Sequence, residues 1–538
     1  MIGPGLSRRS LLAGSLAAAV PVATSAAPAA KDWSPLLRDF RIPDWFADAK
    51  FGIWSHWGPQ CVPEMGDWYG RLMYVQGHPF HDHHVRTYGH PSRTGFLDLI
   101  GRWKAERWEP QALMDRYVKA GARYFVSMAN HHDNLDNFDS AHHAWNTTRV
   151  GPKCDIVGTW EKLARRAGLR FGVSNHSSHA WHWWQTAYGY DAEGPFKGRR
   201  YDAYWLRGRH GKGRWWDGLD PQLMYTGPTY VPPDGIDTIA EMNAWHDQRD
   251  GLWLEQAPPE RQAFVRGWLL RHKDLVEKYR PDLVYFDDYG LPFGQTGIDA
   301  VAHYYLMSRQ WHGKVDVVAT AKRLSASQRR AIVEDVERGF VADIQAQPWQ
   351  TDTCIGNWHY DRPLYERGGY KSARQVVQRL CDVVSKNGNL LLSIPQRGDG
   401  SIDEKEEEIL DQLTSWFAVN GSAIYGTRPW RTFGEGPTRP PAGMQNEAQA
   451  KPFVAEDIRF TTSAGGLNAI FLDWPSRETA IRSLGRNPLP GARIERVEML
   501  GGGAIPFRRD DDSLRVTLPP PSLGAFVPAV RIVGAGLA

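Results

Sequence analysis

Short apolar segments alternate with longer segments of helical periodicity from about residue 50 to residue 420 of this chain. The apolar segments have the length of buried strands, and in the longer segments apolar residues recur every three or four positions. The predicted strands are Lys50–Trp57, Arg123–Met128, Leu169–Ser174, Asp282–Phe286, Lys314–Ala319 and Asn389–Ile394. The predicted helices are Pro110–Ala120, Gly158–Ala167, Glu260–Tyr279, Asp299–Trp311, Ser372–Ser385 and Glu404–Asn420. This alternation requires a parallel sheet with right-handed crossover connections.

The number of strand–helix units favours a closed barrel over an open doubly wound sheet. No GxGxxG or Walker pattern opens a helix after any predicted strand, which argues against a nucleotide-binding open sheet. The predicted fold class is therefore α/β, with a (β/α)8-like, TIM-type barrel followed by a C-terminal β-sandwich. The irregular segment Asn175–Gly251, rich in Trp, Tyr, His and Gly, interrupts the pattern. Irregular segments of that length are usually functional lids or rims.

The chain changes character after Trp430. Gly434–Pro441 is rich in Gly and Pro, and the remainder offers only short alternating runs that are typical of strands. These runs are Ile458–Thr462, Ala469–Leu472, Ala492–Leu500 and Leu514–Leu518. We expect the barrel domain at residues 31–432 and the β-sandwich at residues 433–538, a division that suits a chain of 538 residues.

The first thirty residues have the pattern of a cleavable export signal. Arg8 and Arg9 stand directly before an apolar run that reaches about Ala23, and small residues follow up to Ala30. The paired arginines resemble a twin-arginine signal. The alternative is a membrane anchor, but the run is too short to span a bilayer comfortably. We therefore predict a signal peptide at residues 1–30 and an exported protein, periplasmic or extracellular.

Charge and cysteine usage exclude several classes of partner and cofactor. The formal net charge of +3 gives no reason to expect nucleic acid or, after signal cleavage, a membrane as partner. The four cysteines form no CxxC or Cys/His cluster, which argues against structural zinc and a disulfide scaffold but leaves one or two bridges open. The 24 tryptophans suit either sugar stacking or a large core, so both interpretations stay open.

Polar side chains follow three predicted strands at the point where each ends. His56 lies at the end of the first strand, His131 and His132 follow the second, and Asp287 and Asp288 follow the fourth. Because catalytic groups of TIM-type barrels lie at the C-terminal ends of the strands, we expect these side chains to meet at the barrel mouth.

Asp287 is the strongest candidate for catalysis. A carboxylate at the end of a buried apolar strand is desolvated and held in place. Cleavage of a glycosidic bond with retention needs such a carboxylate as nucleophile, with a second carboxyl group about 5 Å away as acid/base. The alternative is that Asp287 or Asp288 caps the following turn, as is common at strand ends.

The pair His131 and His132 invites a metal interpretation, because His is the commonest metal ligand. Adjacent side chains at a strand end diverge, however, and no nearby Glu or Cys completes a ligand set. Neutral imidazoles hydrogen-bonded to sugar hydroxyls fit at least as well. We therefore expect no metal and no cofactor.

Several further motifs occur together with these residues. In chain order they are KFGIW with His56-Trp57-Gly58, Pro63, Asp67-Trp68-Tyr69, Met73-Tyr74, His131-His132-Asp133, Phe138-Asp139-Ser140, Pro281–Asp287 (PDLVYFD), Ser385–Leu392 (SKNGNLLL), Gly398-Asp399-Gly400 and Ala423–Thr427 (AIYGT). From about Trp45 to Trp430 this set resembles glycoside hydrolase family 29, the α-L-fucosidases, in residues and in order. No single motif would carry the resemblance.

The resemblance implies a retaining exo-α-L-fucosidase that acts on fucosylated oligosaccharides or polysaccharides. Asp287 matches the family's nucleophile. The position of the acid/base varies within the family, and Glu337 is the best candidate, with Glu334 and Asp335 left open. The histidines would bind fucose hydroxyls and the aromatic residues the apolar side of the ring; the substrate-binding set is His56, Asp67, Trp68, His131, His132 and Tyr285.

The chain departs from the family within the implied sugar pocket. Asp67 stands where Glu is common, the chain reads Gly172-Val173-Ser174-Asn175-His176 where the family commonly has a Tyr pair after the third strand, and only Lys322 and Arg323 approximate an Arg near the acid/base. Such changes bear on the choice of sugar more than on the reaction. The alternatives are a retaining exo-glycosidase for a galacto-configured sugar or a substituted fucose, and a non-catalytic glycan-binding protein. The oligomeric state stays open.

Overall fold

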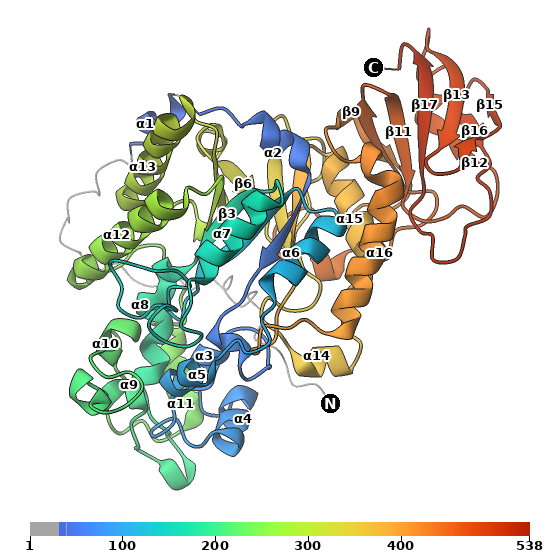
Figure 1. Cartoon of the computed structure of the whole chain (residues 1–538). Coiled ribbons are helices and arrows are strands. Elements are labelled where there is room, and N and C mark those ends of the chain that lie inside the picture. The colour runs from blue at the N-terminus through green and yellow to red at the C-terminus, as the bar shows by residue number, and fades with distance from the viewer. Residues whose placement is uncertain (1–31, 39, 538) are drawn as a thin grey trace, which may run out of the picture.

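The predicted barrel is present and closed. The computed structural model describes residues 32–38 and 40–537, so the predicted signal peptide at residues 1–30 lies outside the described residues. Eight parallel strands pair in sequence order, and β8 pairs with β1 to complete the ring (Figure 1). The strands are β1 Phe51–Ser55, β2 Tyr124–Asn130, β3 Arg170–Asn175, β4 Leu283–Tyr289, β5 Val318–Lys322, β6 Val333–Asp335, β7 Trp349–Cys354 and β8 Gly388–Ser393.

Two barrel strands, β6 and β7, are missing from the predicted set because they are short or polar. All six residues of β7 (WQTDTC) are buried. Some polar side chains inside the barrel bind one another: the Tyr285 hydroxyl donates to Asp352 Oδ2 at 2.7 Å, and Gln350 Nε2 donates to Asp335 Oδ1 at 3.0 Å. A barrel interior that is partly polar therefore hides these strands from a hydrophobic pattern.

The predicted strand Lys314–Ala319 is wrong in position. Lys314 and Asp316 form an ion pair of 3.1 Å ahead of the strand, and the Lys314 side chain is 72% exposed. The strand itself is β5, Val318–Lys322, and all five of its residues are buried. This shift places Lys322 at the C-terminal end of β5, at the mouth of the barrel.

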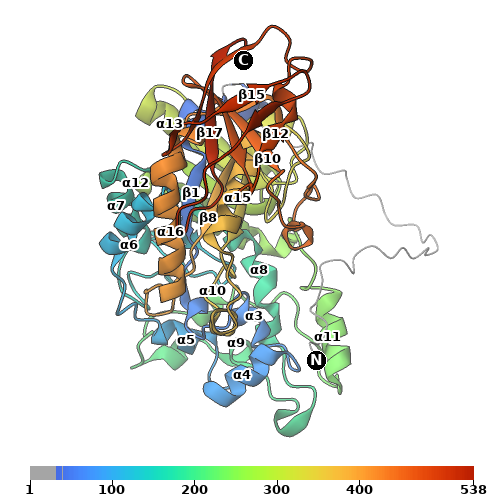
Figure 2. The same ribbon diagram turned by 90° about the vertical axis from the view of Figure 1, so that its right-hand side faces the viewer.

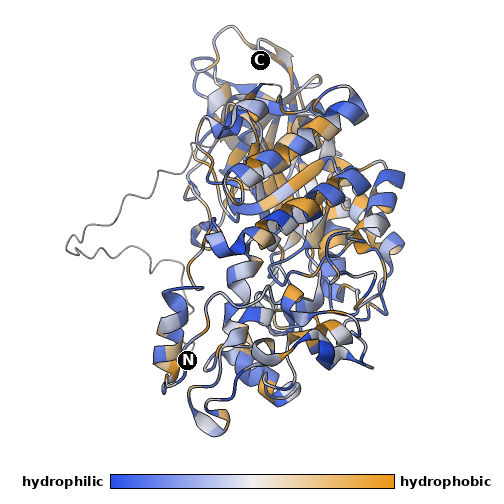
Figure 3. Cartoon of the chain, turned by 90° about the vertical axis from the view of Figure 1, so that its left-hand side faces the viewer, coloured by the Kyte–Doolittle hydropathy of each residue, from blue (hydrophilic) through white to orange (hydrophobic). Residues whose placement is uncertain are grey.

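Helices surround the barrel, and their orange apolar positions face the strands while blue polar positions face outward (Figure 3). The helices around the barrel are α1 Ser34–Leu37, α2 Asp44–Ala49, α6 Pro110–Lys119, α7 Ile156–Arg166, α12 Gln262–Tyr279, α13 Gln295–His312, α14 Arg362–Glu366, α15 Ala373–Ser385 and α16 Glu404–Asn420. Two of them, α15 and α16, begin with capping boxes, formed by Ser372 with Gln375 and by Asp403 with Glu406.

Two long connections form a lobe over the C-terminal ends of the barrel strands. The connection from β1 to β2 contains α3 Tyr69–Leu72, α4 Pro79–Thr87 and α5 Phe96–Arg102. The connection from β3 to α12, which we call the insertion, contains α8 Ala180–Trp183, α9 Asp202–Trp205, α10 Pro221–Met224 and α11 Ile239–Asp247. Both views place α4 beside the insertion helices, at the end of the molecule opposite the C-terminal sheets (Figures 1 and 2).

The C-terminal region consists of antiparallel sheets, as predicted. One sheet has six strands in the order β14-β13-β17-β11-β10-β9, and the other has three in the order β12-β16-β15. Apolar residues of both sheets share one core, for example Phe460 and Ile532 with Leu514. The strands are β9 Arg428–Glu435, β10 Ile458–Ser463, β11 Gly466–Phe471, β12 Thr479–Ile481, β13 Arg493–Met499, β14 Gly503–Ala504, β15 Phe507–Arg509, β16 Leu514–Val516 and β17 Ala529–Ala535.

The larger C-terminal sheet packs against α15 and α16 of the barrel. The buried Arg459 on β10 donates to Asp382 on α15 at 2.7 Å, and Trp416 Nε1 on α16 donates to the carbonyl of Val527 at 2.9 Å. β9 pairs with β10 of the larger C-terminal sheet and extends across the expected division between residues 432 and 433. The division between the two domains stays a prediction.

Candidate active site

Asp287 lies near the end of β4 with three polar neighbours around its carboxylate. Lys322 Nζ contacts Oδ1, while His132 Nε2 and His176 Nδ1 lie 3.3 Å and 3.2 Å from Oδ2. Burial alone would raise the pKa of Asp287, but the Lys322 charge and the two imidazole contacts hold it well below its usual value. Asp287 is therefore ionised and oriented, which is the state that a nucleophilic carboxylate needs.

Glu337 shares a cation with Asp287. It follows β6 by two residues, is 7% exposed, and its Oε2 lies 2.7 Å from Lys322 Nζ. Burial would lower the pKa of Lys322, but the charges of Asp287 and Glu337 raise it well above its usual value. One permanently charged ammonium thus contacts both carboxyl groups.

The two neighbours of Glu337 considered from the sequence lie elsewhere. Glu334 pairs with Arg329 at 2.5 Å, and the Arg329 side chain is 44% exposed at the surface. Asp335 is fully buried among the barrel strands, where burial and the nearby Asp352 raise its pKa well above its usual value. Of these three acidic residues, the structure brings only Glu337 to Asp287.

The three predicted sugar-binding histidines are buried and adjacent. The ring centroids of His131 and His132 are 4.4 Å apart, and those of His56 and His131 are 5.1 Å apart. Burial lowers the pKa of all three imidazoles, and it lowers the pKa of the neighbouring His176 to about 4. At neutral pH each ring is therefore uncharged and offers one hydrogen-bond donor and one acceptor.

Hydrogen-bond partners assign the tautomer of one of these rings. His132 lies between two acceptors, with Nδ1 2.8 Å from the carbonyl of His176 and Nε2 3.3 Å from Asp287 Oδ2, so its partners do not distinguish its tautomers. Gln60 Nε2 donates to His131 Nδ1 at 2.8 Å, so His131 carries its proton on Nε2. Neither ring nitrogen of His56 has a hydrogen-bond partner among the described residues. Together the rings offer donors and acceptors to a polyhydroxylated ligand.

The expectation that adjacent histidines diverge is wrong for His131 and His132. Atoms of these two rings and of His176 lie within 4.8 Å of one another, and so do atoms of His56, His131 and His359. The ring nitrogens come from the ends of four strands that meet at the barrel mouth, and the spacing of histidines in the sequence does not show this. The argument from diverging side chains therefore no longer supports the expectation that no metal binds, and that expectation stays a prediction.

The other predicted substrate residues lie around these histidines. Asp67 accepts the backbone N–H of His359 at 2.8 Å. Trp68 has a left-handed backbone (φ 64°), and its indole lies edge-on to His132 with centroids 5.9 Å apart. Such a conformation in a bulky residue is costly and is typical of functional sites. Tyr285 is 1% exposed and packs on Trp54 with ring centroids 4.8 Å apart, so it forms part of the floor.

Sequence patterns miss several residues of this site. His359 follows the unpredicted β7, and Trp253 stacks on His179 with centroids 3.8 Å apart from within an irregular loop. Asp288 accepts from Ser178 Oγ at 2.9 Å and lies 3.1 Å from His179 Nε2. Burial and the charge of Asp287 raise the pKa of Asp288 to about 7, and burial and the charge of Asp288 raise the pKa of Glu255 to about 8. The only signal for Trp253 and His179 was the high content of Trp and His in the insertion, whereas Asp288 already stood at the end of the fourth predicted strand.

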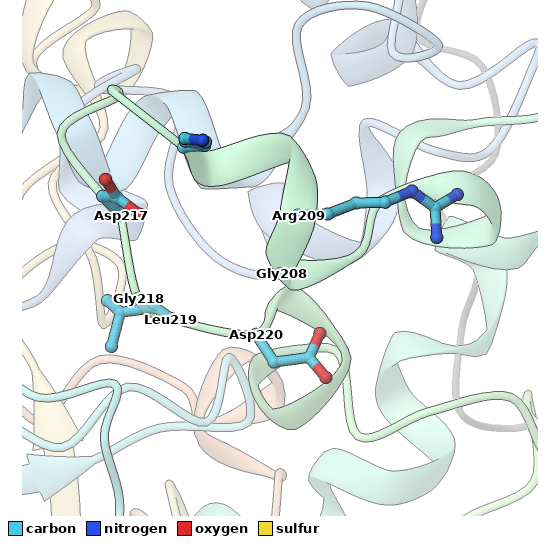
Figure 4. A pocket seen from close by; sticks show the side chains of 7 residues that line it. Gly208, Arg209, Asp217, Gly218, Leu219 and Asp220 are labelled. Carbon is cyan, nitrogen blue, oxygen red and sulfur yellow. The ribbon is translucent and has the colours of Figure 1, made fainter.

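A hollow of about 490 Å³ lies on the surface of the insertion. Figure 4 shows the chain from Gly208 to Asp220 curving around it, with Asp217 and Arg209 on opposite sides. It shares no residue with the site at the barrel mouth.

All four cysteines lie in the described part of the chain and are unpaired, so neither of the bridges left open by the sequence forms. Over residues 32–38 and 40–537, no helix combines the length and the apolar character that a bilayer span requires.

The closed barrel and the polar pocket at its mouth, with two carboxyl groups on one lysine, define the class of protein as a barrel glycoside hydrolase. The family model for Alpha-L-fucosidase matches residues 16–422. The chain belongs to the α-L-fucosidase family, glycoside hydrolase family 29, and the resemblance in its motifs is confirmed. Membership in this family of hydrolases argues against the alternative of a non-catalytic glycan-binding protein.

Known relatives cover nearly the whole chain. The tissue alpha-L-fucosidase of Macaca fascicularis is 25% identical over 515 residues, which are 94% of this chain and 91% of the relative. That of Homo sapiens is 25% identical over 516 residues, again 94% and 91%. The crystal structure of Thermotoga maritima alpha-fucosidase in complex with fucose is 25% identical with a TM-score of 0.63, covering 92% of this chain and 98% of that chain.

Proposed function

We propose that the chain is a retaining exo-glycosidase that removes terminal α-L-fucosyl residues from glycans by double displacement. The observation that carries the proposal is the contact of Lys322 Nζ with both Asp287 and Glu337. Two oxygens that accept hydrogen bonds from one tetrahedral ammonium nitrogen lie about 4.4–5.2 Å apart. Retaining glycosidases hold their carboxyl groups about 5–5.5 Å apart, whereas inverting enzymes need about 6.5–9.5 Å to admit a water molecule.

In the first step, the Asp287 carboxylate forms a bond to the anomeric carbon as the glycosidic bond breaks. Glu337 gives its proton to the departing oxygen. In the second step, Glu337 takes a proton from water, the water oxygen bonds to the anomeric carbon, and the bond to Asp287 breaks. The position of Lys322 supports these roles, because its ammonium contacts both the carboxylate that would attack and the carboxyl group that would transfer the proton.

The histidines suit recognition of sugar hydroxyls. His131 Nε2–H donates, and the unpartnered nitrogens of His56 can donate or accept. Buried imidazoles without partners are costly, so a sugar that satisfies them binds with discrimination. Trp68 and Tyr285 would contact the apolar side of the ring.

Two variants and one control test the roles. Asp287→Asn should lower kcat on an aryl α-L-fucoside by at least about 10⁴-fold, and Glu337→Gln by about 10²–10⁴-fold on fucosylated oligosaccharides but less on substrates with an acidic leaving group. Glu334→Gln, which alters only the pair with Arg329, should leave both rates unchanged. NMR should show α-L-fucose as the first anomer. If Glu337→Gln keeps full activity and Asp335→Asn is inactive, the acid/base role belongs to Asp335 instead. Initial release of the β-anomer would exclude a retaining mechanism.

The preferred sugar is part of the same proposal. Asp67 accepts from backbone amides of the loop after β7 and His176 contacts Asp287, so these two of the three departures from the family lie beside the proposed pocket. A panel of aryl glycosides of α-L-fucose, galacto-configured sugars and substituted fucose decides the question. Highest kcat/KM on a sugar other than α-L-fucose would favour the alternative substrate.

We also propose that the protein is exported and that residues 1–30 are its signal. Replacement of Arg8 and Arg9 by Lys in a bacterial host with a twin-arginine system should retain the enzyme in the cytoplasm. Equal export of this variant would remove the twin-arginine interpretation.

A further inference from the structure

A second cluster of histidines and a carboxylate lies in the lobe, away from the sugar pocket. His81 on α4, His90 shortly after α4 and Asp191 in the insertion are 4%, 6% and 3% exposed. We call these residues the lobe cluster. The reaction proposed above uses none of them.

The lobe cluster has short distances without hydrogen-bond alignment. His81 Nε2 lies 3.3 Å from Asp191 Oδ1, and His90 Nε2 lies 3.1 Å from Asp191 Oδ2. Yet both ring nitrogens of His81 and Nε2 of His90 have no hydrogen-bond partner among the described residues. Buried polar atoms without partners are rare and costly. Atoms that converge but do not point at one another are expected when they share a ligand between them.

The donor set identifies the class of ligand. Two imidazole nitrogens and one carboxylate oxygen suit Zn²⁺ among the common divalent cations. A tetrahedral Zn²⁺ with bonds of about 2.0–2.1 Å holds neighbouring donor atoms about 3.3–3.4 Å apart. Each of the two nitrogen–oxygen distances, which run to different oxygens of the Asp191 carboxylate, is close to that edge length. One donor atom from each of the three residues lies within 4.8 Å of the others.

Neighbouring groups hold the cluster in place. The Tyr201 hydroxyl donates to Asp191 Oδ1 at 2.6 Å, and Phe196 stacks on His90 with ring centroids 4.0 Å apart. Ser92 Oγ lies 2.8 Å from His90 Nδ1, where it can accept the proton that a metal-bound ring keeps on that nitrogen. The Ser92 N–H at 3.2 Å from the same atom favours the opposite tautomer, so a metal-free His–Asp–His arrangement is the competing state.

We propose that His81, His90 and Asp191 bind one divalent cation of the Zn²⁺ type, which ties α4 to the insertion. In Figures 1 and 2, α4 lies beside the insertion helices. The tied segments belong to the two connections that also carry Trp68 and His176, so the ion stabilises the lobe around the sugar pocket without taking part in the reaction.

Metal content of the mature enzyme tests the proposal. Protein stripped with a chelator and reconstituted with Zn²⁺ or Co²⁺ should bind one equivalent with high affinity, and Co²⁺ should give the intense visible absorption of a tetrahedral site. His90→Ala and Asp191→Asn should lose this equivalent, and Zn²⁺ should raise the Tm of the wild type but not that of Asp191→Asn. His83→Ala, a half-exposed histidine on the same helix, should bind like the wild type.

Three results would overturn the inference. The first is a wild-type enzyme that binds neither ion stoichiometrically at micromolar concentration. The second is undiminished binding by folded Asp191→Asn, an isosteric change whose folding is checked by circular dichroism. The third is loss of the equivalent in His131→Ala with retention in His90→Ala, which would place the ion in the sugar pocket.

Discussion

Replacing Lys322 by Met tests whether its charge sets the ionisation of the catalytic pair. The Lys322 side chain is only 4% exposed and contacts both carboxyl groups, so solvent screens it little. At an effective dielectric constant of about 20, unit charges about 4 Å apart interact by about 4 kcal/mol. That energy equals about three pKa units.

The expected effect is a displaced pH profile. Lys322 favours the ionised form of Asp287 and holds its pKa below the usual value, so loss of the charge should raise that pKa by about 2–3 units. The acidic limb of kcat/KM on an aryl α-L-fucoside, measured from about pH 3.5 to 9, should move upward by the same amount. Denaturant unfolding should also show a loss of about 3–5 kcal/mol, because two buried acidic groups lose their cation.

Two controls separate charge from packing. Lys322→Arg keeps the charge and should keep the position of the acidic limb. Lys314→Met removes an exposed lysine just ahead of β5 and should change neither the profile nor the stability. A natively folded Lys322→Met enzyme whose acidic limb moves by less than about half a pH unit would refute the electrostatic reasoning.

Three further variants test other parts of the structure. Asp382→Ala leaves the buried Arg459 without its carboxylate partner and should lower the free energy of unfolding in urea at pH 7 by about 3–5 kcal/mol. Because Arg459 and Lys386 outweigh burial and lower the pKa of Asp382, this contribution to stability is present above about pH 4 and is lost below it. A decrease of less than about 1 kcal/mol would contradict the role of this ion pair. Burial raises the pKa of Asp288 to about 7, so the free energy of unfolding of the wild type should decrease as the pH rises from about 4 to about 7. Asp288→Asn should remove up to about 4 kcal/mol of that decrease. Parallel curves of unfolding free energy against pH for the wild type and the variant would contradict this prediction. Trp253→Ala removes the ring stacked on His179 and should lower kcat/KM about tenfold. Trp205→Ala, at an exposed tryptophan of the insertion, should leave kcat/KM unchanged. Equal effects of the two substitutions would place Trp253 outside the pocket.

The sequence by itself determined the barrel, the antiparallel C-terminal region and the family. Apolar strands such as Asp282–Phe286 and amphipathic helices such as Glu260–Tyr279 are local patterns, and their alternation admits few topologies. The expectation that His56, His131 and Asp287 meet also required only the rule that parallel strands end at one face of a barrel.

Tertiary structure alone decided which carboxyl group joins Asp287 and which cation they share. Glu334, Asp335 and Glu337 are nearly equivalent in the sequence, and they separate because each leaves β6 in a different direction. Lys322 lies at the barrel mouth because β5 continues three residues beyond the predicted end at Ala319. The lobe cluster likewise joins two distant connections. Such distances are set by barrel closure and by the packing of loops, and neither depends on the periodicity of any one segment.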